Sequence, residues 1–100
     1  NARLYRNAKV YDKAQVYGGA WLSGDSEVYG NAQVFGNALV YGEAKVYENA
    51  TVYDRAWLSG EAKISGEARV YGDAEVRGNA KVYGDSEVFG DSKVYDNAEV

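Results

Sequence analysis

Few side chains of this sequence are suited to catalysis. It has no histidine and no cysteine, which removes the commonest general base, the commonest metal ligand and every thiol reaction. Its 15 aspartates and glutamates are spread along the chain. Three serines (Ser26, Ser86 and Ser92) stand at positions that we expect to point inward, without a base beside them. We therefore predict no catalytic residue, no metal site, no cofactor and no enzymatic activity within these residues.

The charge balance also excludes two classes of partner. With 11 Lys and Arg against 15 Asp and Glu, the formal net charge is -4, so neither nucleic acid nor an anionic membrane surface is expected to attract the chain. No apolar run approaches the length of a membrane span. We expect no targeting segment in these residues, which begin with Asn1 and stop inside the repeat pattern. We expect a fragment, a processed chain or an engineered one, and the compartment stays unknown.

A six-residue repeat must position these side chains. Sixteen complete hexads and a final NAEV follow one another without insertion or deletion. The second position holds 14 Ala and 3 Ser, and the fourth holds 13 Val, 3 Leu and 1 Ile. Because alternate residues of a strand face the same side, each Ala-x-Val unit predicts a three-residue strand with both apolar side chains directed inward.

Each hexad also predicts a turn. Gly fills 11 of the 16 sixth positions, and Gly, Asn and Asp accept the backbone conformations that tight turns need. The apolar spacing does not trace one face of an α-helix, and the repeated Gly would weaken a helix. Strands this short cannot form a sheet alone, so successive turns of the chain must stack. The sequence therefore predicts an all-β solenoid, a single repeat domain spanning residues 1–100.

An aliphatic residue followed four places later by a small one is found in Val10-Tyr-Asp-Lys-Ala14, in Val34-Phe-Gly-Asn-Ala38 and in the other hexads. In this the chain resembles the hexapeptide-repeat, left-handed parallel β-helix proteins over its full length. The resemblance implies a triangular prism with about 18 residues per coil, and hence about 5.5 coils. That family includes acyltransferases and zinc-dependent carbonic anhydrases, whose functional histidines have no counterpart here.

Residues about 18 apart then lie above one another, so the outward positions form columns. The fifth position carries all ten Tyr and both Phe, and one of its three columns is unbroken: Tyr17, Phe35, Tyr53, Tyr71 and Phe89. We predict an aromatic ladder along this corner. The alternative is a surface on which sugar rings stack.

One outward wall differs from the other two. At the third position of its hexads stand Arg3, Trp21, Leu39, Trp57, Glu75 and Lys93. Trp21, Leu39 and Trp57 are consecutive in this column, and three contiguous apolar side chains form a patch of the size at which contact surfaces begin. In both tryptophan hexads a serine, Ser23 or Ser59, replaces the corner aromatic and leaves room for the indole.

We predict that Trp21, Leu39, Trp57 and Tyr41 form a partner-binding surface, because Trp is enriched at contact centres. The partner is another protein, a packed neighbouring segment or a second copy of this chain. Two alternatives stay open: an ordinary wall partly covered by Tyr41, and a carbohydrate-binding surface. The open coil ends are a second candidate for self-association, since neither end carries a polar cap.

An acidic column at one corner, formed by Asp25, Glu43 and Glu61, is the one candidate for a hard cation such as Ca²⁺. We expect Lys45 and Lys63, two residues further along, to pair with Glu43 and Glu61 instead. Taken together, the residues indicate a non-catalytic structural or interaction scaffold. The alternatives are a carbohydrate-binding surface, or the scaffold of a hexapeptide-repeat acyltransferase whose active site lies outside this sequence.

Overall fold

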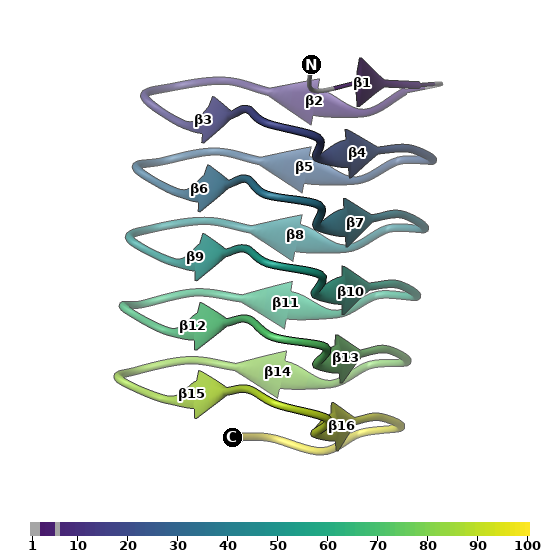
Figure 1. Cartoon of the computed structure of the whole chain (residues 1–100), viewed down its shortest axis with the longest axis vertical. Helices are drawn as coiled ribbons and strands as arrows, with labels where there is room; N and C mark the ends of the chain where they lie inside the picture. Colours follow the sequence, from purple (N-terminus) through teal and green to yellow (C-terminus); the bar gives the residue numbers. More distant parts are fainter. Residues whose placement is uncertain (1–2, 6) are drawn as a thin grey trace.

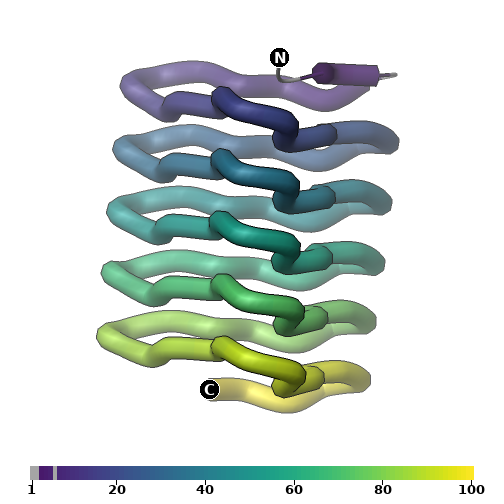
Figure 2. Tube along the Cα trace, in the orientation of Figure 1, coloured from purple at the N-terminus to yellow at the C-terminus, as the bar shows by residue number. Residues whose placement is uncertain are grey.

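Sixteen short strands stacked as a coil make up the part of the chain that the structure describes. The computed structural model describes residues 3–5 and 7–100. In this part of the chain there is no helix, and hence none that could cross a membrane. The chain winds through successive coils from the N-terminus at one end of the long axis to the C-terminus at the other (Figures 1 and 2).

Three parallel sheets form the walls of this coil. Sheet A contains β1 (Arg3–Leu4), β4 (Trp21–Leu22), β7 (Leu39–Val40), β10 (Trp57–Leu58), β13 (Glu75–Val76) and β16 (Lys93–Val94). Sheet B contains β2 (Lys9–Val10), β5 (Glu27–Val28), β8 (Lys45–Val46), β11 (Lys63–Ile64) and β14 (Lys81–Val82). Sheet C contains β3 (Gln15–Val16), β6 (Gln33–Val34), β9 (Thr51–Val52), β12 (Arg69–Val70) and β15 (Glu87–Val88).

Each strand pairs with the strand three places along the chain, in a register that does not shift. Trp21 lies beside Leu39, and Leu39 lies beside Trp57, so partners are separated by 18 residues in the sequence. The molecule measures 28 × 21 × 20 Å. The predicted parallel β-solenoid with about 18 residues per turn is confirmed, whereas its handedness and triangular cross-section stay predictions from the resemblance.

The strands are two residues long, not three as the Ala-x-Val unit predicts. The reason lies in the hydrogen bonds of the turn. The second-position N–H donates to the fifth-position carbonyl three residues earlier, as in Ala62 to Ser59 at 3.3 Å. That N–H is used within its own coil, so the strand begins at the third position. Leu39 N–H, for example, donates to the Ala56 carbonyl at 2.8 Å. The first-position N–H also donates across coils, as Glu43 does to the Gly60 carbonyl at 2.7 Å.

The sixth position of the hexad has a left-handed backbone, which explains its glycines. Gly66 has φ +66°, and a Cβ built there would lie 2.7 Å from the backbone nitrogen of Gly84 in the next coil. Asp12, Glu48, Asp54 and Asp96 adopt the same conformation with φ 59°. In three of these cases the carboxylate accepts a hydrogen bond from the N–H of the coil below, as Asp54 does from Gly72 at 3.2 Å. That bond offsets part of the strain.

The core is a column of small and aliphatic side chains, as predicted. Ala44 and Ala62 are fully buried, and so are Leu22, Leu58 and Ile64. The inward serines differ by their distance from the ends. Ser26 is fully buried with an unpaired hydroxyl, Ser86 is half-buried, and Ser92 is exposed. Ser92 makes the same turn hydrogen bond as the other second-position residues, to the Phe89 carbonyl at 3.2 Å, and its exposure reflects its place in the last coil.

Candidate functional site

Sheet A places the predicted surface residues on one wall. Strands β4, β7 and β10 are neighbours, and their register puts Trp21, Leu39 and Trp57 side by side. Both indoles are 44% exposed, and Leu39 between them is half-buried. We call this column of three residues the tryptophan wall. Its charged neighbours in the same register are Arg3 beside Trp21 and Glu75 beside Trp57.

Each indole packs against the tyrosine of the preceding coil. Trp21 meets Tyr5 edge-on, with ring centroids 5.6 Å apart, and Trp57 meets Tyr41 in the same way at 6.4 Å. The Arg3 guanidinium lies 5.6 Å from the Trp21 ring centroid, close enough for a cation–π contact. These contacts fix the orientation of the indoles and leave the outer part of each exposed.

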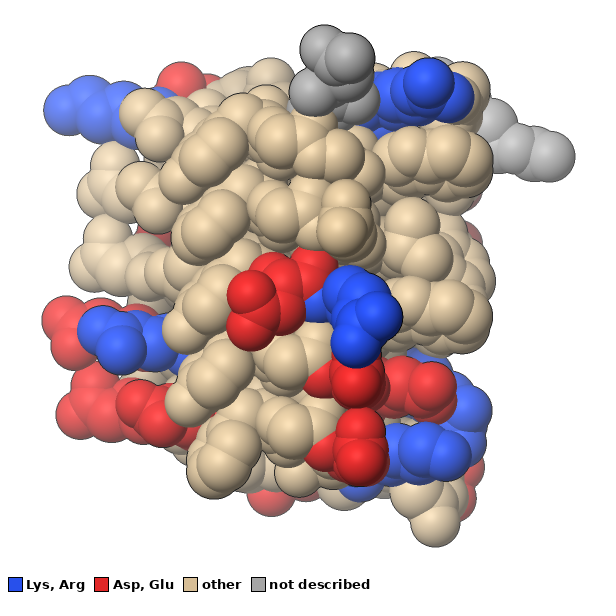
Figure 3. All heavy atoms as spheres, viewed as in Figure 1, with Lys and Arg blue, Asp and Glu red and all other residues tan. Residues whose placement is uncertain are grey.

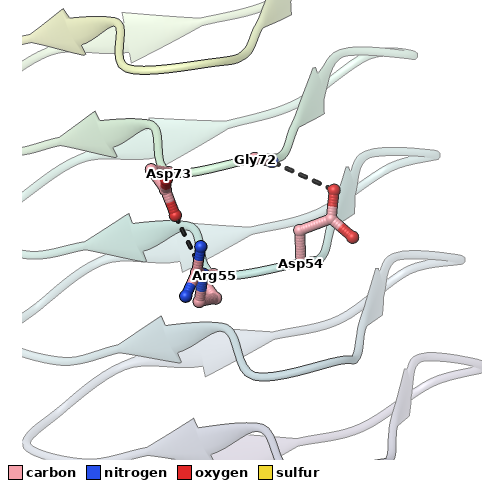
Figure 4. A network of polar contacts seen from close by, with 4 residues as sticks. All are labelled: Asp54, Arg55, Gly72 and Asp73. Carbon is pink, nitrogen blue, oxygen red and sulfur yellow. Dashed lines mark hydrogen bonds and ion pairs between the residues drawn. The ribbon is translucent and has the colours of Figure 1, made fainter.

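A polar border lies beside Trp57. The Arg55 Nε atom forms an ion pair with Asp73 at 3.0 Å, next to the Asp54–Gly72 hydrogen bond (Figure 4). Arg77 reaches Glu75 at 3.4 Å. A hollow of about 320 Å³ is lined by Arg55, Trp57, Asp73 and Glu75. The face in Figure 3 carries most of its charged side chains in the half nearer the C-terminus.

The predicted aromatic ladder is confirmed along the corner that follows sheet C. Its five rings are stacked nearly parallel, with centroids 4.9 to 5.5 Å apart and interplanar angles of 4° to 13°. A shorter stack of Tyr11, Tyr29 and Tyr47 follows sheet B. Burial, and then the negative charge of Glu27 or Glu87 nearby, raises the pKa of Tyr11 and Tyr71 respectively. The ladders hold aromatic rings at regular spacing along two corners.

The ion pairs expected for the acidic column are absent. Among the described residues, neither Glu43 with Lys45 nor Glu61 with Lys63 forms an ion pair. All four side chains reach solvent, where such pairs gain little energy. Asp25 instead accepts a hydrogen bond from Asn7 at 3.0 Å. No group of three or more possible metal ligands occurs in residues 3–5 and 7–100.

The coil ends, the second predicted contact region, both carry exposed apolar side chains. At the N-terminal coil Leu4 is 46% exposed, and a hollow beside it is lined by Val10, Ala14 and Val16. At the other end Val88 and Val94 are 4% and 9% exposed. Val100 at that end is 42% exposed, so apolar side chains reach solvent at both coil ends. Association through either end stays a prediction.

Sequence reasoning missed two groups of residues. One is the polar border of Trp57, whose Arg55 and Asp73 lie in neighbouring coils and can be paired only once the 18-residue register is known. The other is a hollow lined by Tyr47, Lys63, Ser65, Lys81 and Tyr83, among others. The signal for this hollow was present in the sequence, because Ser65 interrupts a column of tyrosines.

Part of the chain is similar to a known β-solenoid repeat. A family model of the YdcK beta-solenoid repeat matches residues 28–42 and 32–48. No curated protein matches the chain. The YdcK repeat match covers the coils around β5 to β8 and supports a β-solenoid repeat scaffold. It includes Leu39 and Tyr41 but neither tryptophan, so the indoles of the wall are not accounted for by this similarity. It lends no support to the acyltransferase-like family.

Proposed function

We propose that this chain is a non-catalytic β-solenoid scaffold that binds a second copy of itself through the tryptophan wall. The observation that carries the proposal is the in-register column of Trp21, Leu39 and Trp57 on one sheet, with both indoles 44% exposed. Trp is enriched at the centres of protein contacts. The absence of His and Cys leaves the chain without the groups that most catalytic sites use.

The order of residues along the wall favours a second copy over another partner. Read from the N-terminal coil, the column runs Arg3, Trp21, Leu39, Trp57, Glu75. In two copies related by a twofold axis through Leu39, the columns run in opposite directions. Trp21 of one copy then faces Trp57 of the other. Arg3 of one copy then faces the carboxylate of Glu75 in the other. The tryptophan wall is therefore complementary to a second copy of itself, both in the positions of its apolar side chains and in charge.

The size of the wall predicts a weak dimer. The molecule is 28 Å long and 20 to 21 Å across, so one wall offers on the order of 500 Å², and two facing walls bury roughly twice that area, near the lower limit for a specific interface. Association should therefore depend on concentration within the range that sedimentation velocity covers.

Sedimentation velocity on the wild type and on Trp57→Lys tests this function. The wild type should shift from monomer to dimer as its concentration rises, whereas Trp57→Lys should stay monomeric. Lys already occupies the third position in much of sheet B, so the variant should fold. Tyr17→Lys is a matched control, because Tyr17 is 45% exposed but lies at another corner. A wild type that is monomeric throughout, or a Trp57→Lys variant that still dimerises, contradicts the proposal.

A second candidate, carbohydrate binding, is favoured by the hollow beside Trp57. There an exposed indole lies next to the Asp73 and Glu75 carboxylates and the Arg55 guanidinium, a combination that offers a ring face together with hydrogen-bonding groups for hydroxyls. Tryptophan fluorescence measured against a panel of oligosaccharides separates the two functions. A saturable change that Trp57→Lys removes supports glycan binding, and a flat response across the panel excludes it.

A further inference from the structure

One ring is missing from the stack of tyrosines that follows sheet B. Tyr11, Tyr29 and Tyr47 stack with centroids 4.9 and 5.2 Å apart and interplanar angles of 2° and 6°. The next position in this column is Ser65, and the one after it is Tyr83. Since adjacent coils lie about 4.8 Å apart, Tyr47 and Tyr83 are held at levels about 10 Å apart. That is twice the stacking distance, which leaves room for one planar ring.

A hollow occupies the place of the missing ring. It has a volume of about 460 Å³, and its lining includes Tyr47 and Tyr83 on either side and Ser65 between them. This volume lies within the range of small-molecule sites. Tyr83 is 47% exposed, and the stack above Tyr47 is regular. The hollow is therefore a slot with an aromatic residue at each end, and we call it the Ser65 slot.

The tyrosines of the ladders show which way a ring in the slot would point. Their hydroxyls donate to the carboxylate of the residue 16 positions ahead: Tyr11 to Glu27 at 3.3 Å, Tyr71 to Glu87 at 3.3 Å and Tyr83 to Glu99 at 3.4 Å. The residue 16 positions ahead of Ser65 is Lys81. A ring in the slot would therefore direct its outer substituent toward an ammonium group.

The charges around the slot are mainly positive where the ring substituent would lie. Lys63 and Lys81 are neighbours in the register of sheet B, and both line the hollow. Glu48 is the one acidic residue of the lining, and its Oε1 atom accepts a hydrogen bond from Gly66 N–H at 2.7 Å. A carboxylate on the ring would meet two ammonium groups, and such charge-assisted contacts are among the stronger hydrogen bonds.

From these contacts we propose that the Ser65 slot binds a planar aromatic carboxylate. The ring stacks between Tyr47 and Tyr83 in the place of the missing ring, and the carboxylate lies against Lys81 and Lys63. The site is on a different sheet from the tryptophan wall, so it is independent of dimer formation.

Isothermal titration calorimetry with naphthalene-2-carboxylate tests this site. The wild type should bind it saturably, with a dissociation constant below about 1 mM for a ligand of this size. Ser65→Tyr should abolish binding, because the new ring completes a column that already holds tyrosine at positions 11, 29, 47 and 83. Lys81→Glu should weaken binding about tenfold or more. Lys9→Glu, in the same sheet but far along the column, should leave it unchanged.

Two further ligands separate the roles of ring and charge. Naphthalene-2-carboxamide keeps the ring and should bind about tenfold more weakly than the carboxylate. Cyclohexanecarboxylate keeps the charge but has no flat aromatic face, and it should not bind. The proposal is overturned if the wild type shows no saturable binding of naphthalene-2-carboxylate, or if Ser65→Tyr, shown by circular dichroism to be folded, binds it as well as the wild type does.

Discussion

At two corners of the solenoid a serine stands where the neighbouring coils have a tyrosine, but the surfaces beside the two serines differ. Ser23 stands between Tyr5 and Tyr41 in its column, and Ser65 stands between Tyr47 and Tyr83 in another. Beside Ser23, the indole of Trp21 packs edge-on against Tyr5 at 5.6 Å. Beside Ser65 there is a hollow of about 460 Å³.

The residue two places before the serine differs between the two hexads. In one hexad this residue is Trp21, whose ring reaches the neighbouring tyrosine. In the other it is Lys63, a flexible cation with no ring to place there. A missing corner aromatic therefore produces an apolar wall in one place and an open, positively charged slot in the other.

The largest effect should come from the backbone that both corners share. Gly24 and Gly66 follow the two serines with φ +69° and +66°, and a Cβ at either would lie 2.7 Å from backbone of the next coil. We expect Gly24→Val and Gly66→Val each to lower the free energy of unfolding by about 3 kcal/mol. Urea denaturation measures this. Strongly unequal losses would show that the two corners differ in backbone and not only in side chains.

A smaller effect is expected from overfilling the common core. Ala20 belongs to the Ser23 hexad and Ala62 to the Ser65 hexad, and both are fully buried. Ala20→Leu and Ala62→Leu should each cost about 1–3 kcal/mol, because the added carbons have no free volume to enter. The same urea experiment applies. If either variant retained full stability, its small residue would not face a tightly packed interior.

Replacing the third-position residues should change stability in opposite directions at the two corners. Lys63→Trp should place an indole against Tyr47, raise stability by about 1 kcal/mol and close the Ser65 slot to naphthalene-2-carboxylate. Trp21→Ala should lose about 1 kcal/mol with the Tyr5 contact. Urea denaturation and calorimetry measure both changes. If Lys63→Trp bound naphthalene-2-carboxylate as well as the wild type does, the third-position residue would not control whether the Ser65 slot is open.

The smallest effect concerns pH. Burial, followed by the neighbouring Tyr47 and Glu27, raises the pKa of Tyr29. A raised tyrosine pKa favours the neutral folded state, so its contribution is complete below the ordinary value of 10.0 and is lost as pH rises above it. Tyr29→Phe keeps the ring in the stack and should lose less stability than the wild type above pH 10. Identical alkaline denaturation curves would contradict this.

The fold could be predicted from the sequence because one pattern repeats without interruption. Alternation within the hexad placed Ala44 and Ala62 in the core. The 18 residues per coil that the resemblance to hexapeptide-repeat proteins implied placed Trp21, Leu39 and Trp57 on one wall. Strand length could not be predicted, since it depends on which carbonyl the second-position N–H selects. The Ser65 slot was missed because a column shows which side chains are present, whereas a cavity depends on how far Lys63 and its neighbours extend.

The self-complementary wall is tested most directly by reversing its charges. Sedimentation velocity would compare Arg3→Glu, Glu75→Arg and the double variant with the wild type. In the antiparallel dimer each Arg3 faces a Glu75, so either single variant should weaken dimerisation by placing like charges together, and the double variant should restore it. Glu75→Arg also removes the ion pair with Arg77, which makes restoration the decisive result. Single variants that dimerise like the wild type, or a double variant that stays monomeric, would contradict the account.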